Sequence, residues 1–313
     1  MAFADKPQVY NATINALTFG TDGKEVTLGG ENVYPLYSFD GSLGNPARIG
    51  ALISDNGYDK EIPGLAAFFE GCDTVPAMAA KLVAETAADF ICLTLDSADP
   101  NGANTAVADE VELVKAVYDA IDKPLAVSGC HNVEKDTELF NAIAEAMQGK
   151  NILLLSAREE DYKTIGASAV MAYNQCIGAE SAVDINLAKQ LNVLLSQLGV
   201  SADKTVMNLG SAAVGYGFEY LASTIERVKL AALTQNDASL QMPVVTNVGD
   251  DAWNVKEALL EEADAPEWGA REERGIQMEI SSAAASLASG TNCVLLRHPE
   301  SIKTISGMIA GLM

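Results

Sequence analysis

The sequence predicts an α/β fold, a (β/α)₈ barrel of the TIM type with an N-terminal β-hairpin arm. Two observations support this prediction. Eight short apolar runs follow one another along the chain, and amphipathic segments of helical length separate most of them. The length of 313 residues is also about what such a barrel needs. We expect the arm at residues 1–46 and the barrel at residues 47–313, together forming a single structural domain.

The first 46 residues have a different pattern from the rest of the chain. Residues 25–28 form a short strand-like run, Gly29 and Gly30 follow it, and residues 33–39 form a second apolar stretch. Two such stretches around a glycine turn are typical of a β-hairpin. We therefore expect the two strands of the arm at residues 25–28 and 33–39.

The eight apolar runs are nearly continuous in hydrophobicity, as parallel strands covered on both faces must be. They lie at residues 48–54, 90–95, 124–128, 151–156, 172–178, 205–208, 243–248 and 292–297. An open doubly wound sheet is the alternative architecture. That fold usually carries G-x-G-x-x-G after its first strand, and no such motif follows any of these runs.

Helical segments separate most of the strands. They are expected at residues 75–86, 106–121, 135–147, 184–198, 219–233, 274–287 and 299–312. Asp184 is placed as a helix cap, and Pro299 is placed as a first-turn proline.

Charge and composition argue against several classes of partner. Asp and Glu number 43 against 20 Lys and Arg, a formal net charge of −23. Such a chain is repelled by nucleic-acid phosphates and by anionic lipid surfaces, so we expect neither partner. No apolar run is long enough to span a membrane, and the first residues lack the pattern of a signal peptide, so we expect a cytoplasmic protein.

Motifs for catalysis or metal binding are absent from the sequence. The five cysteines form no C-x-x-C pair, and there are only two histidines. We find no G-x-S-x-G, H-E-x-x-H or P-loop, and no D-x-H-x-x-G that would supply a histidine to a corrinoid cobalt. We therefore assign no catalytic residue and no metal ligand. Adjacent acids such as Asp250 and Asp251 are expected on a solvated face.

Binding residues of a barrel lie in the loops after its strands. Asn101 lies in a loop rich in carboxylates and amides, although the same residues are ordinary turn formers. Tyr216 and Gly217 lie in a glycine-rich loop that suits a flat ligand, with a flexible turn as the alternative. The adjacent Cys130 and His131 are expected to be structural rather than a metal or nucleophilic pair.

Two further strand ends carry polar candidates. Asn247 lies near the end of the seventh run, Arg297 ends the eighth, and His298 follows it. Arg297 could contact an anionic or amide-rich ligand, or it could pair with a nearby acid and order its loop. Trp253 and Trp268 suit ligand or partner contact, with ordinary packing as the alternative.

An ordered set of segments resembles a known family. The segments are 26–31, 34–35, 39–41, 88–93, 97–101, 134–136, 184–189, 215–220, 226–227, 268–275 and 297–299. Together they resemble the small subunit of the corrinoid iron–sulfur protein, whose archaeal counterpart is the delta subunit of the acetyl-CoA decarbonylase/synthase complex. The resemblance covers nearly the whole chain.

The resemblance implies a (β/α)₈ barrel that pairs with a large subunit. The large subunit carries a four-iron cluster, and a corrinoid (cobalamin) lies at the interface, where the barrel covers one side of it. The heterodimer takes a methyl group from methyltetrahydrofolate through a separate methyltransferase. It delivers the methyl group to acetyl-CoA synthase/CO dehydrogenase, in the Wood–Ljungdahl pathway of carbon fixation.

Two departures from the family pattern stand out. Asn208 occupies a position where an aspartate is usual, and residues 129–132 differ from the common glycine-rich form. Related pterin-binding barrels hold the pterin ring with an aspartate at a strand end. Asn208 cannot supply that charge, which weakens the prediction that this chain binds a pterin itself.

Three functions are weighed. The first is a scaffold subunit that covers a partner-held corrinoid through Asn101, Tyr216, Gly217, Asn247, Arg297 and His298. The second is a corrinoid methyltransferase that uses methyltetrahydrofolate or methyltetrahydropterin on its own, for which Asp96, Asp99 and Asn247 could imitate a pterin site. The third is an unrelated barrel enzyme acting on a small anionic metabolite. The first is preferred, because the resemblance implies it, and because the absence of a cysteine cluster and of a cobalt-ligand histidine agrees with a partner that holds both cofactors.

Overall fold

Eight parallel strands close into a barrel in the computed structural model, which describes residues 6–312. The order around the barrel is β10-β3-β4-β5-β6-β7-β8-β9. The strands are β3 (Arg48–Ser54), β4 (Phe90–Thr94), β5 (Leu125–Ser128), β6 (Leu153–Ala157), β7 (Cys176–Glu180), β8 (Thr205–Asn208), β9 (Val244–Asn247) and β10 (Cys293–Leu296). The predicted (β/α)₈ barrel is therefore confirmed, and the open doubly wound sheet is excluded.

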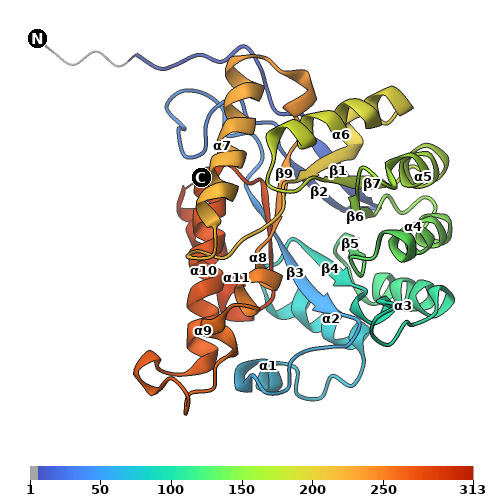
Figure 1. Cartoon of the computed structure of the whole chain (residues 1–313), viewed down its shortest axis with the longest axis vertical. Helices are drawn as coiled ribbons and strands as arrows, with labels where there is room; N and C mark the ends of the chain where they lie inside the picture. The colour runs from blue at the N-terminus through green and yellow to red at the C-terminus, as the bar shows by residue number, and fades with distance from the viewer. Residues whose placement is uncertain (1–5, 313) are drawn as a thin grey trace, which may run out of the picture.

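Helices surround the strands (Figure 1). The long ones are α2 (Val75–Glu85), α3 (Val107–Ala120), α4 (Val133–Ala146), α6 (Ile185–Leu198), α7 (Phe218–Thr234), α10 (Arg271–Ser289) and α11 (Pro299–Leu312). Four short helices lie in connections: α1 (Pro63–Phe68), α5 (Tyr162–Ile165), α8 (Val248–Trp253) and α9 (Lys256–Leu259). Asp184 caps α6 as predicted, because its carboxylate accepts from the backbone N–H of Asn186 at 2.6 Å. No helix within residues 6–312 is long and apolar enough to cross a bilayer.

The N-terminal hairpin exists, but its strands differ from those expected. β1 (Leu17–Thr21) pairs antiparallel with β2 (Lys24–Leu28), and Asp22 and Gly23 form the turn with φ of 59° and 84°. Positive φ at both turn residues is what a tight hairpin turn requires. Residues 33–39 form no strand, so that part of the prediction is wrong. Gly29 and Gly30, at φ of 82° and 88°, instead direct the chain away from β2.

The hairpin closes the amino-terminal end of the barrel. Phe19 is fully buried, and its ring meets that of Phe90 edge-on at 5.1 Å. Asn151, just before β6, donates to the carbonyl oxygen of Thr18 at 3.0 Å, and Lys24 donates to that of Ile121 at 2.9 Å. The hairpin is therefore packed as a plug, which leaves the opposite end of the barrel as the open mouth.

The connection between β6 and β7 also departs from expectation. The fifth strand was expected at residues 172–178, but it begins at Cys176. The short helix α5 and a π-helical turn (Gly166–Ala172) precede it. The turn ends at Ala172, the first residue of the expected run, and residues 173–175 form a short connection to the strand.

Candidate functional site

Two adjacent hollows lie at the carboxyl ends of the barrel strands. We call this end of the barrel the mouth. Asp250 lines both of them. The first hollow is also lined by Ser54, Thr94, Asp96 and Arg297, among others. The second is also lined by His131, Glu180, Asn208, Gly210, Ser211, Asn247 and Asp251, among others. Carboxylates, amides and hydroxyls therefore line the mouth together with apolar side chains such as Leu52 and Leu295.

Asn247, Asp250 and Arg297 form one hydrogen-bonded group between the hollows. The Asn247 amide donates to Asp250 Oδ2 at 2.5 Å, and Arg297 Nη2 donates to Asp250 Oδ1 at 2.7 Å. Arg297 is about one third exposed, so the pair remains accessible to solvent. The structure thus brings two predicted site residues together through an acid, and Arg297 forms the acid pair that the sequence left as an alternative.

His298 lies behind the mouth rather than in it, with 4% of its surface exposed. Its Nδ1 accepts from the N–H of Glu300 at 3.2 Å, and its Nε2 lies 3.1 Å from a Glu272 carboxylate oxygen. Because Nδ1 accepts, Nε2 is the nitrogen that donates to Glu272. The ring also stacks on Trp253, whose centroid is 5.7 Å away. Trp253 is 6% exposed, so it packs in the core.

A second group lies at the ends of β6, β7 and β8, next to β9 in the barrel. Arg158 donates to both carboxylate oxygens of Glu180, at 3.0 and 3.3 Å. Asn208 donates to Ser156 Oγ at 3.1 Å and approaches Glu180 Oε2 at 3.5 Å. Glu180 holds the pKa of the half-buried Arg158 above its usual value, against the opposing effect of burial. Asn208 is therefore fixed by this network.

A third group ties together the loops after β3 and β4. Asp96 accepts hydrogen bonds from the hydroxyls of Ser54 at 2.5 Å and Thr94 at 3.0 Å, both through Oδ2. Within residues 6–312, no hydrogen bond reaches Asp96 Oδ1. Asp99 lines neither hollow and instead accepts the side-chain amide of Asn101 at 3.1 Å. The structure therefore places Asp96 and Asn247 in adjacent hollows and leaves Asp99 outside both.

The loop residues lie at the rim of the mouth. Asn101 is exposed in the loop after β4. Tyr216 is 46% exposed, and its hydroxyl lies 2.6 Å from a carboxylate oxygen of Glu257 in α9. Gly217 immediately precedes α7 at φ 86°, a conformation that favours glycine. None of these three residues lines either hollow, so the structure does not bring them together with Asn247 and Arg297.

Few groups in the mouth are suited to nucleophilic catalysis. Burial raises the pKa of Cys130 to about 11, so its sulfur remains a thiol at neutral pH. Its backbone N–H donates to buried Asp136 at 2.7 Å, a structural contact. Ser211 pairs with Asp251, which is half-buried and has a raised pKa because of that burial. Among residues 6–312, no three His, Cys, Asp or Glu side chains are placed to hold one metal ion.

Several mouth residues were not predicted from the sequence. Asp250 and Asp251 were expected on a solvated face, but both line the mouth and bond to neighbouring side chains, so that expectation is wrong. Their position directly after the seventh apolar run was the available signal. Arg158 directly follows β6 and Glu180 ends β7, but their pairing appears only once the barrel closes.

Comparison with known proteins identifies the family. The model of the CO dehydrogenase/acetyl-CoA synthase delta subunit matches residues 16–267. The chain belongs to this delta subunit family. It is thus a relative of subunits of the acetyl-CoA decarbonylase/synthase complex, as the ordered sequence segments indicated, and membership implies protein partners.

Curated relatives in the delta subunit family come from several archaea. Subunit delta 2 of the acetyl-CoA decarbonylase/synthase complex from Methanosarcina acetivorans is 33% identical over 309 residues, covering 93% of this chain and 68% of the relative. The delta subunit from Archaeoglobus fulgidus is 31% identical, covering 93% of this chain and 67% of the relative. The delta-family relatives are therefore about half as long again as this chain.

Solved structures similar to this delta-family chain are also barrels. Dihydropteroate synthase from Xanthomonas albilineans, bound to 4-aminobenzoic acid, aligns with a TM-score of 0.57 at 13% identity, covering 95% of this chain and 98% of that one. The Thermus thermophilus enzyme aligns with a TM-score of 0.55 at 12% identity, covering 95% and 100%. At these identities the likeness shows the fold alone.

Proposed function

We propose that the mouth of this chain covers a corrinoid held by a larger partner subunit. In this proposal the pair carries a methyl group from methyltetrahydrofolate, through a separate methyltransferase, to acetyl-CoA synthase. The four-iron cluster belongs to the partner. The observation that carries the proposal is membership in the delta subunit family over most of the chain. A bound corrinoid supplies the methyl-carrying chemistry, because its cobalt accepts and releases methyl groups.

The residues of the mouth suit a corrinoid chemically. The edge of a corrin ring carries carboxamide groups, which both donate and accept hydrogen bonds. Asn247, Asn208 and Ser211 offer amide and hydroxyl groups at one edge of the mouth. Gly210 has no side chain at φ 85°, so a ligand can approach the backbone closely there. The donor set therefore fits the periphery of such a ring.

Positioning is the role that we assign to this chain. Asn101, Tyr216, Gly217, Asn247 and Arg297 would contact the ligand or the partner at the rim. His298 would help to position Arg297 from behind the mouth. The Glu279 carboxylate accepts hydrogen bonds from the backbone N–H groups of both residues, at 2.5 Å for Arg297 and 3.2 Å for His298. This buried carboxylate orients the strand end that presents Arg297. The mouth would then exclude water from one side of the ligand.

A charge at the rim tests this proposal in the assembled complex. We expect Tyr216→Lys to lower the cobalt content of the purified heterodimer at least twofold, because the large exposed ring is replaced by a strongly hydrated ammonium. Tyr37→Lys is the matched control, since Tyr37 is similarly exposed at 48% and lies in the N-terminal loop. Cobalt per heterodimer is measured by elemental analysis. Unchanged cobalt in Tyr216→Lys would contradict the proposed contact.

A methyltransferase that binds methyltetrahydrofolate itself is the second candidate. The observation that favours it is the position of Asp96 in the mouth, with one carboxylate oxygen unbonded by residues 6–312. Calorimetric titration of the isolated chain with methyltetrahydrofolate separates the two functions. The corrinoid-covering role predicts no saturable binding. Saturable binding that Asp96→Asn abolishes would favour the methyltransferase.

A further inference from the structure

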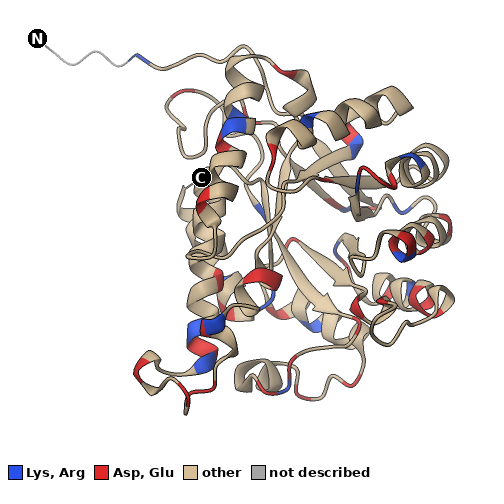
Figure 2. Cartoon of the chain, viewed as in Figure 1, with Lys and Arg blue, Asp and Glu red and all other residues tan. Residues whose placement is uncertain are grey.

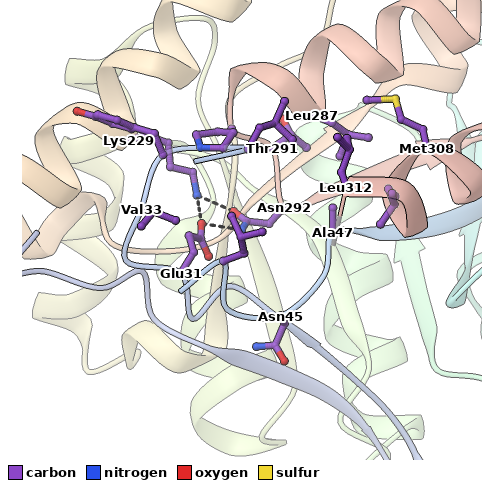
Figure 3. A pocket seen from close by; sticks show the side chains of 16 residues that line it. Glu31, Val33, Asn45, Ala47, Lys229, Leu287, Thr291, Asn292, Met308 and Leu312 are labelled. Atoms are coloured by element: carbon purple, nitrogen blue, oxygen red, sulfur yellow. Dashed lines mark hydrogen bonds and ion pairs between the residues drawn. The ribbon is translucent and has the colours of Figure 1, made fainter. Parts of the chain in front are cut away.

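A pocket lies outside the barrel, near its amino-terminal end (Figure 3). Residues 31–47 form one wall, and α7, α10, α11 and residues 290–292 contribute the rest. Its volume is about 680 Å³, including the part that opens to solvent. The walls are mainly apolar and include Val33, Leu43, Leu287 and Met308. This pocket shares no lining residue with the mouth, so it is a separate site.

A buried ion pair forms the polar part of this pocket. Lys229 is 2% exposed and donates to Glu31 Oε1 at 2.5 Å and to Asn292 Oδ1 at 2.8 Å. The Asn292 amide in turn donates to the same Glu31 oxygen at 2.8 Å. Figure 3 shows the three side chains converging from three separate segments. Glu31 Oε1 therefore accepts two hydrogen bonds, from Lys229 and Asn292. Asn292 Oδ1 also accepts two, from Lys229 and from the backbone N–H of Val244.

The other oxygen of Glu31 has no partner. Glu31 is 8% exposed, and its Oε2 is buried without a hydrogen bond from any residue in 6–312. Burial opposes ionisation, but Lys229 and Asn292 hold the pKa of Glu31 below its usual value, so the group is a carboxylate. Buried acceptors are nearly always satisfied in folded proteins. Among residues 6–312 this oxygen therefore has no donor, and another molecule could supply one.

The charge balance defines the chemistry of that molecule. Glu31 and Lys229 neutralise each other, so a charged ligand would bring an uncompensated charge into a buried place. The ammonium of Lys229 has three N–H groups, and residues 6–312 pair two of them. A hydroxyl or amide group can donate to Glu31 Oε2 while keeping an oxygen for a donor. The apolar walls suit an aliphatic body.

We propose that this pocket binds a small neutral amphiphile, an aliphatic molecule whose single hydroxyl or amide group donates to Glu31 Oε2. The proposal is independent of the corrinoid function, because it rests on different residues at the other end of the barrel. A lone water molecule bonded to Glu31 is the competing explanation, and the experiment below distinguishes the two.

The test uses the full chain, with the methionine methyl groups labelled with ¹³C for NMR. Met308 lines the pocket, so its methyl signal reports occupancy. The probes are 1-hexanol and its isomer 1-methoxypentane, which has the same atoms but no O–H donor. We expect 1-hexanol to shift the Met308 signal saturably and to bind at least tenfold more tightly than the ether. Hexylammonium and hexanoate, which carry a charge, should bind more weakly than 1-hexanol.

Two variants complete the test. Ala47→Leu adds bulk to the pocket wall and should weaken 1-hexanol binding at least tenfold. Ala116→Leu, on the exposed face of α3, is the matched control and should leave binding unchanged. Equal affinity for the alcohol and the ether would overturn the role of Glu31. A Met308 shift that does not saturate would mean that the pocket holds only water, and it would overturn the proposal. An affinity for 1-hexanol that Ala47→Leu leaves unchanged would also overturn it.

Discussion

Glu110 shows how one buried carboxyl group responds to its surroundings. It is 1% exposed, and Ser97 donates its hydroxyl to one carboxylate oxygen at 2.9 Å. Burial raises the pKa of Glu110 to about 7, and the nearby charge of Asp55 adds to that effect. Asp55 also accepts the backbone N–H of Ser97 at 2.9 Å, so this group joins the loops after β3 and β4.

This raised pKa predicts the pH dependence of stability. A carboxyl group whose pKa is higher in the folded than in the unfolded state stabilises the fold when protonated. That contribution is complete below about pH 4 and is lost as pH rises through about 7. We therefore expect the free energy of unfolding to fall between pH 5 and 8, and Glu110→Gln to reduce that slope. Urea unfolding at several pH values measures it.

The control for this experiment is Glu138→Gln, because Glu138 is exposed on α4. Its pH slope should equal that of the unmodified chain. Burial also raises the pKa of Asp161, to about 6. Asp161 therefore adds a smaller pH slope of the same sign to the unmodified chain and to both variants. If Glu110→Gln retained the full slope, the assignment to Glu110 would be wrong.

At the scale of elements, the hairpin β1–β2 is the part of the fold with the clearest energetic role. Leu17, Phe19 and Leu28 are fully buried against side chains that point into the barrel. A barrel of eight strands has an interior that side chains must fill. The hairpin supplies part of that filling, so the N-terminal segment stabilises the same core as the strands.

Truncation of the central aromatic ring tests the plug. We expect Phe19→Ala to reduce the free energy of unfolding by about 3–5 kcal/mol, because it leaves a cavity against Phe90. Phe39→Ala is the control, since Phe39 is 62% exposed, and should change stability by about 0.5 kcal/mol or less. Chemical denaturation measures both. A loss below about 1 kcal/mol in Phe19→Ala would contradict the plug.

The sequence predicted the strands well because buried parallel strands have a distinctive apolar pattern. It failed where two structures share a pattern. Residues 33–39 are as apolar as a strand, but Tyr34 packs edge-on against Tyr10, and Val33 lines the pocket outside the barrel. The segment is therefore an irregular loop. The hairpin turn at Asp22 and Gly23 was available in the sequence, because Asp-Gly is a strong turn signal.

The mouth was only partly predictable for a similar reason. The strand ends place Asn247 and Arg297 in the mouth, as the barrel model requires. Which acid each one meets depends on the packing of neighbouring loops, and the pairing of Arg297 with Asp250 joins residues 47 positions apart. His298 lies buried behind the mouth because its ring stacks on Trp253 and faces Glu272, contacts that no linear pattern encodes.

At the scale of the whole molecule, charge is distributed over helices and loops. Figure 2 shows acidic and basic residues along the outer helices, while the barrel strands carry few. The net charge of −23 means that a partner covering the mouth must tolerate or neutralise an acidic surface.

Family membership, read from segments spread over the chain, was the strongest prediction from the sequence, and the comparisons confirm it.

The most direct test of the central proposal is gentle anaerobic purification of this chain from its own host. Mass spectrometry would identify co-purifying polypeptides, and elemental analysis would give cobalt and iron per chain. The account predicts a near-stoichiometric larger partner, with about one cobalt and four iron atoms per pair, as a corrinoid and a four-iron cluster imply. A chain that purifies without a partner and without cobalt, and that turns over methyltetrahydrofolate, would contradict it.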